Sequence, residues 1–108
     1  MINYLSVSKE QVPLLMLLNI EDEQYTFEFD YNAKYDYFSV SLSRNGTLLV
    51  QGEKIVLDRP LFATINNPFE FTTFIPMDIA GLEQFATYSN LNDTVFILQG
   101  VVEWPNNE

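Results

Sequence analysis

Histidine and cysteine are absent from this 108-residue sequence, and glycine occurs only four times. Without histidine the chain lacks the usual general base near neutral pH, the partner of a Ser–His nucleophile pair and the commonest metal ligand. Without cysteine it can form neither a disulfide framework nor a thiolate metal site. The four glycines do not have the spacing of a phosphate-binding loop or a dinucleotide fingerprint. We therefore predict that the chain is not an enzyme, that it has no catalytic residue, and that it binds no cofactor or metal.

Basic residues are also scarce: five Lys and Arg stand against 15 Asp and Glu, and the formal charge is −10. Such a field repels nucleic acid and anionic membranes, whose binding depends on Lys and Arg. The longest aliphatic run, residues 14–18, is too short to span a bilayer, and no basic segment introduces a signal peptide. We expect neither nucleic acid nor a membrane as partner. The charge either attracts a protein with a basic face or serves solubility alone.

Two clusters of acidic residues are candidates for a catalytic or a metal site. Glu28 and Asp30 fall on one face of a predicted strand, where they form either a catalytic carboxylate pair or a solvated surface. We favour the surface, because a catalytic acid needs burial or a like charge to raise its pKa. The consecutive residues 21–23 lack the spacing of a calcium loop, so we predict a charged turn there.

One further acidic residue has a predicted structural role: Asp78 is expected to cap a turn or a short helix.

Alternating apolar and polar residues are what this sequence has in abundance, in a chain that is 47% hydrophobic and 15% aromatic. Period-two alternation is typical of a half-buried strand, and it predicts strands over residues 25–32 and 36–43. Asn45-Gly46 is the preferred pair for a type I′ turn and predicts a hairpin with residues 47–51. The side chains expected on the buried faces are Tyr25, Phe27, Phe29, Tyr31, Phe38, Val40 and Leu42.

The remaining segments carry weaker signals. We predict a helical turn over residues 6–11, strands over 14–20, 54–57 and 69–77, and a loop or one to two helical turns over 79–91. Pro76 is expected to end the 69–77 strand. Residues 94–104 are apolar on both faces, which favours a central strand or a barrel wall. Together these elements predict an all-β fold, a small barrel or sandwich of six to eight short, mainly antiparallel strands. We expect one domain over residues 1–108, with residues 1–12 flexible or helical.

Three aromatic residues are candidates for an interface. Tyr35 and Tyr37 are expected opposite the buried face of the 36–43 strand, among serines, a composition that is common at protein interfaces. The alternative for both is cover by a neighbouring strand or loop. Trp104 either anchors a partner or closes one end of the core, and we favour the core because Trp is usually largely buried.

The order of short motifs resembles the phage baseplate plug family. An aromatic strand ending in Tyr31-Asn32 is followed by Leu48-Leu49-Val50-Gln51-Gly52 and by Ile55-Val56-Leu57. Phe74-Ile75-Pro76-Met77-Asp78 and the strand at 94–98 also fit, so the resemblance covers residues 25–98. The sequence departs from the family pattern at Phe38, where a Trp is expected, and in the content of residues 81–92.

This resemblance implies a structural protein of a phage or phage-like tail baseplate, with no catalytic residues to carry over. It would be made in the host cytoplasm and would reside in the virion tail, bound to other baseplate proteins near the hub. Two other functions fit the composition. One is an acidic inhibitor that mimics DNA, which requires carboxylates aligned on one surface. The other is a carbohydrate-binding module, which requires exposed aromatic residues around a concavity with Asp or Asn beside them.

Overall fold

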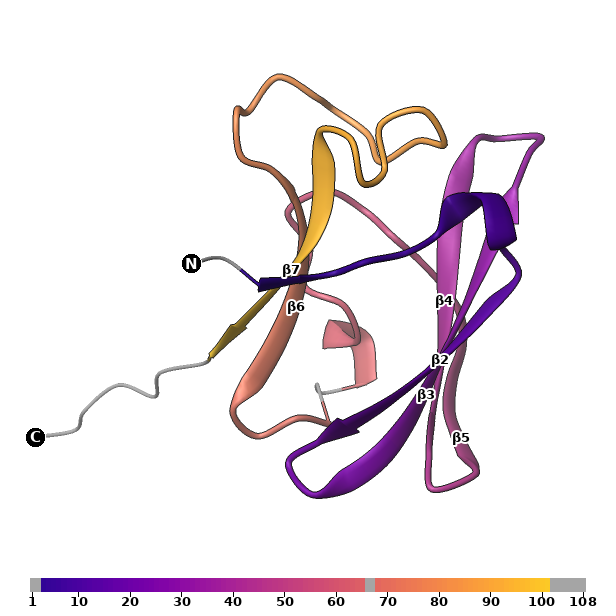
Figure 1. Cartoon of the computed structure of the whole chain (residues 1–108), viewed down its shortest axis with the longest axis vertical. Helices are drawn as coiled ribbons and strands as arrows, with labels where there is room; N and C mark the ends of the chain where they lie inside the picture. The colour runs from indigo at the N-terminus through magenta and orange to yellow at the C-terminus, as the bar shows by residue number, and fades with distance from the viewer. Residues whose placement is uncertain (1–2, 66–67, 102–108) are drawn as a thin grey trace, which may run out of the picture.

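In the computed structural model, which describes residues 3–65 and 68–101, two antiparallel β-sheets face each other (Figure 1). The strand order is β1-β7-β6 in one sheet and β2-β3-β4-β5 in the other. The all-β prediction is confirmed, and the described chain is a sandwich, not a closed barrel. The elements in chain order are β1 (Asn3–Leu5), the 3-10 helix η1 (Lys9–Gln11), β2 (Leu14–Ile20), β3 (Glu23–Asn32), β4 (Tyr37–Arg44), β5 (Thr47–Lys54), the 3-10 helix η2 (Ala63–Ile65), β6 (Thr72–Asp78) and β7 (Val95–Val101).

The four-stranded sheet is a meander whose turns follow from the residues at its corners. Asn45 and Gly46 join β4 to β5 with φ angles of 49° and 86°, which is the positive-φ pair that a type I′ turn needs. Glu21 and Asp22 join β2 to β3 and also have positive φ, at 54° and 67°. Neither has glycine's freedom, so this second turn depends on side-chain contacts to hold it.

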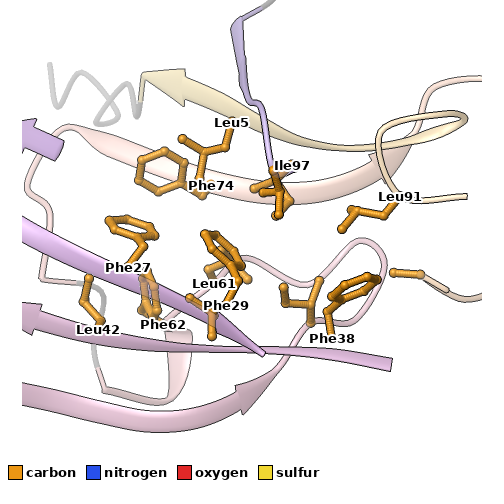
Figure 2. Close-up of a cluster of buried hydrophobic side chains, with 14 of the residues drawn as sticks. Leu5, Phe27, Phe29, Phe38, Leu42, Leu61, Phe62, Phe74, Leu91 and Ile97 are labelled. Atoms are coloured by element: carbon orange, nitrogen blue, oxygen red, sulfur yellow. The ribbon is translucent and has the colours of Figure 1, made fainter. Parts of the chain in front are cut away.

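Aromatic and aliphatic side chains together fill the space between the sheets (Figure 2). Phe27 lies at the centre, and its ring centroid is 5.4 Å from that of Phe74 on the opposite sheet and 5.6 Å from that of Phe62. Such edge-to-face contacts add to the hydrophobic gain of burial. The predicted buried faces of the 25–32 and 36–43 strands are confirmed, except that Tyr31 is only half-buried.

Three sequence predictions about single elements were wrong. Residues 54–57 form no separate strand, because β5 runs on through Gly52 to Lys54 with a bulge against β4. Pro76 lies within β6 instead of ending it. This is tolerated because β6 is an edge strand, where a missing N–H breaks no ladder. β1 was not predicted at all: residues 3–5 pair with β7, whereas only a flexible or helical segment was expected before residue 13.

Other predictions were confirmed. The helical turn expected in residues 6–11 is η1, although Ser8 at its N-cap makes no side-chain capping bond. β7 is the central strand of its sheet, with Val95 and Ile97 facing the core and Phe96 and Leu98 on the half-buried outer side. Within the described residues no helix is long and apolar enough to cross a membrane.

Glu21 ties the two sheets together at one end of the sandwich. Its carboxylate accepts hydrogen bonds from the main-chain N–H of Glu70 (2.8 Å) and Phe71 (2.7 Å) and from the Thr72 hydroxyl (3.1 Å). Desolvation raises the pKa of Glu21, but these hydrogen bonds outweigh it and leave the pKa below its usual value. The charged turn predicted at residues 21–23 therefore positions the start of β6.

Candidate docking groove

A groove opens at the other end of the sandwich, where three segments meet. They are the β3–β4 turn, the chain that leaves β5, and part of the long loop between β6 and β7, seen in the upper half of Figure 1. The volume of the groove is about 430 Å³, within the range of ligand-binding pockets. Its walls are formed by Tyr35, Asp36, Tyr37, Lys54, Ile55, Val56, Leu57, Gln84, Phe85, Ala86 and Thr87.

The β3–β4 turn is held in place by short-range hydrogen bonds. The Asn32 side-chain oxygen accepts the N–H of Tyr35 at 3.0 Å, and the Asn32 carbonyl accepts that of Asp36 at 2.8 Å. Asp36 adopts a φ of 57°, a conformation that Asp tolerates better than most residues. This geometry leaves Tyr35 66% exposed at the rim of the groove.

Asp36 also joins the turn to the β6–β7 loop. Its Oδ1 accepts the main-chain N–H of Tyr88 at 3.0 Å and the hydroxyl of Tyr31 at 2.7 Å. The bond from Tyr88, followed by that from Tyr31, lowers the pKa of Asp36. The same contact raises the pKa of the Tyr31 hydroxyl. A single ionised carboxylate thus fixes two walls of the groove relative to each other.

The β6–β7 loop is irregular but extensively hydrogen-bonded. The Asp78 carboxylate accepts the N–H groups of Ala80, Leu82 and Glu83, and the bond from Glu83 is the main cause of its lowered pKa. The capping role predicted for Asp78 is confirmed.

Asn90 is the second organising residue of this loop. Its buried side chain accepts the Thr87 N–H at 2.7 Å and donates to the Phe85 carbonyl at 2.8 Å. Phe85 is therefore held by its backbone while its ring remains 69% exposed. An exposed ring on a fixed backbone is suited to contact with a partner, since little ordering entropy is lost on binding.

Residues 2–101 match the family described as "Cyanophage baseplate Pam3 plug gp18". The match covers nearly the whole chain. The chain belongs to this family. Among curated proteins no match was found. The family is that of a phage baseplate plug, and a structural role in a tail baseplate agrees with membership in it.

In this plug-family chain, two of the three predicted interface residues line the groove. Tyr37 points outward from β4, on the face opposite Phe38, and Tyr35 lies on the adjoining turn. Trp104 lies outside the described residues. Lys54, Phe85 and the 55–57 segment also line the groove and were not predicted to do so. The groove is formed where three segments far apart in sequence meet, so no local sequence pattern indicates that these residues line it.

The outer face of the four-stranded sheet has a different character. Glu28 and Asp30 on β3 project there beside the serines of β4, and Leu15 and Leu17 on the edge strand β2 are exposed next to them. Neither acidic residue takes part in a hydrogen bond with another described side chain. Glu28 is exposed and Asp30 half-buried, and both lie on the outward face that the alternation predicts.

Proposed function

We propose that this chain is a structural subunit of a phage or phage-like tail baseplate that binds neighbouring baseplate proteins near the hub. The observation that carries the proposal is a groove with fixed, exposed aromatic rings in a member of a baseplate plug family. Aromatic residues on a rigid scaffold are the usual anchors of protein interfaces. In this proposal the acidic outer face around Glu28 and Asp30 meets a basic surface of a second neighbour.

The proposal is tested in assembled tails. A photo-reactive phenylalanine analogue is incorporated at position 35, and separately at position 47, the first residue of β5, next to the β4–β5 turn at the opposite end of β4. Purified tails should contain the chain, and irradiation should join position 35 to a neighbouring baseplate protein more efficiently than position 47. Tails that assemble without this chain would rule out the structural role. Equal cross-linking at the two positions would rule out the groove as the contact.

A carbohydrate-binding role is the second candidate, and one observation favours it. Tyr35, Tyr37 and Phe85 surround a concavity with Asp36 and Gln84 beside them, which is the arrangement that a sugar site requires. Asp36 already uses one oxygen for contacts within the chain, which leaves fewer acceptors for sugar hydroxyls. Binding to any member of a glycan array, lost in Phe85→Ala, would support this candidate, and silence across the array would remove it.

The DNA-mimic alternative rests on the net charge of −10 alone. Such an inhibitor needs carboxylates aligned in solvent at the spacing of phosphates. Here Glu21, Asp36 and Asp78 bind main-chain N–H groups of their own chain, and they serve the fold.

A further inference from the structure

Positive charge is concentrated at the groove end of this acidic chain. The chain has five cationic side chains, and three of them lie over tyrosine rings at this end. The ammonium groups of Lys54 and Lys34 are 4.8 Å and 5.2 Å from the ring centroids of Tyr37 and Tyr35. Lys9 lies 5.1 Å from that of Tyr88. Cation–π contact of this kind holds a lysine in place without neutralising it.

In the described part of the chain, Lys34 and Lys54 make no close ion pair with a carboxylate. Within residues 3–65 and 68–101, no Asp or Glu oxygen lies within 4.0 Å of the ammonium group of Lys34 or Lys54. Asp36 is the only carboxylate in the lining, and its Oδ1 is bound by Tyr31 and Tyr88. The groove thus combines a mainly apolar lining with the ammonium group of Lys54, which makes no close ion pair within the described chain, in a molecule whose net charge is −10.

Some residues of the lining have main-chain donors that are unpaired within the described chain. Among contacts between described residues, the N–H groups of Val56, Leu57 and Ala86 have no hydrogen-bond acceptor, although all three residues line the groove. Donors of this kind that reach solvent bind water in a free protein, and the carbonyls of an extended peptide satisfy them equally well. Recognition of extended segments commonly combines main-chain bonds with pockets for individual side chains.

We propose that the groove binds an extended segment of a neighbouring baseplate protein in which a carboxylate side chain is flanked by aliphatic or aromatic residues. The carboxylate binds the ammonium group of Lys54, and the apolar side chains pack on Phe85, Val56 and Leu57. The partner segment at this site is therefore acidic, whereas the outer face around Glu28 meets a basic surface. This inference rests on the proposed function and specifies its partner.

The test is an NMR titration of the ¹⁵N-labelled full chain with two blocked peptides, acetyl-Leu-Glu-Phe-Gly-amide and its Gln counterpart. The Glu peptide should shift the amide signals of Lys54, Val56, Leu57 and Phe85. It should bind about fivefold more tightly than the Gln peptide, the upper range for a solvent-exposed ion pair. Lys54→Gln should remove that difference, while the control Arg44→Gln, at the far end of β4, should preserve it. Unchanged signals elsewhere in both variants verify that the fold is intact.

Equal affinity for the two peptides, or shifts away from the groove, would overturn the inference. Shifts at the groove by a chitin or maltose oligomer but by neither peptide would overturn it in favour of a sugar site. These outcomes are separable from failure of the proposed function. One result would be that tails contain the chain and cross-link through position 35, while the groove binds the Glu and Gln peptides equally. The structural role would then stand, and only the acidic partner segment would be ruled out.

Discussion

Aromatic rings occupy two regions of this molecule, and their surroundings differ. In the core, Phe27, Phe62, Phe69 and Phe74 contact one another at centroid distances between 5.4 and 6.4 Å and are shielded from solvent. At the groove, Tyr35 and Phe85 are largely exposed, although their backbones are anchored through Asn32 and Asn90.

Burial distinguishes the rings that stabilise the fold from the rings that are available to a partner. A ring contributes hydrophobic free energy to folding only when neighbours remove it from water, as they do around Phe27. The groove rings are held outward by hydrogen bonds to their backbones, so their apolar surface is still available to a partner. Each of the following predictions tests one side of this difference.

The largest effect is expected at the centre of the core. Phe27→Ala should lower the free energy of unfolding by about 3–5 kcal/mol, because it removes a buried ring and leaves a cavity between the sheets. Urea denaturation followed by circular dichroism measures the change, and Phe27→Leu, which keeps most of the volume, should cost clearly less. A loss below about 1 kcal/mol for the Ala variant would show that this ring is not central to the core.

A smaller loss is expected where Glu21 joins the two sheets. In Glu21→Gln only one side-chain oxygen remains to accept the N–H groups of Glu70 and Phe71, so the free energy of unfolding should fall by about 1–2 kcal/mol. Asp22→Asn is the matched control in the same turn and should change stability little. Equal losses of stability in the two variants would show that the turn itself, and not the hydrogen bonds of the Glu21 carboxylate, stabilises this end of the sandwich.

The pH dependence sharpens the role of Asp36. The pKa of Asp36 is lowered in the folded state, so its contribution is complete above the ordinary carboxyl pKa of about 4 and is lost as the pH falls through the lower folded value. Asp36→Asn keeps an acceptor oxygen but removes the charge. We expect a cost of about 0.5–1 kcal/mol at pH 7 and a shallower loss between pH 5 and pH 2. Identical pH profiles of variant and parent would contradict the assignment.

The smallest effect on stability is expected at the groove. Phe85→Ser should change the free energy of unfolding by less than about 0.5 kcal/mol, since the ring is exposed and the loop is held by Asn90. The same substitution should abolish cross-linking from position 35 in assembled tails. If it instead destabilised the chain as a core substitution does, Phe85 would belong to the packing of the fold.

Most strands could be predicted from the sequence, because strand alternation and turn residues are local signals. The 25–32 alternation located β3 and its buried face, and Asn45-Gly46 located the β4–β5 turn through its need for positive φ. β1 was missed because three residues are too few for a periodic pattern. Pro76 was misassigned because the tolerance of proline depends on whether a strand lies at the sheet edge, which is a property of the assembled sheet.

The candidate site was only partly predictable. Tyr35 and Tyr37 could be assigned to an outward face from the alternation of β4, which left open whether another segment covers them. Lys54, Phe85 and Asp36 carry no local signal of a shared site. Their relation depends on the Asp36–Tyr88 hydrogen bond, which joins residues 52 positions apart.

By itself, the sequence determined the class of the fold, the identity of the buried faces and the absence of histidine and cysteine chemistry, because each follows from residue type and short-range spacing. The tertiary structure alone decided which outward residues share a groove and where three lysines gather in an acidic chain. Those facts depend on how the two sheets bring distant turns together, and the pattern of one strand contains no information about its neighbours across the sandwich.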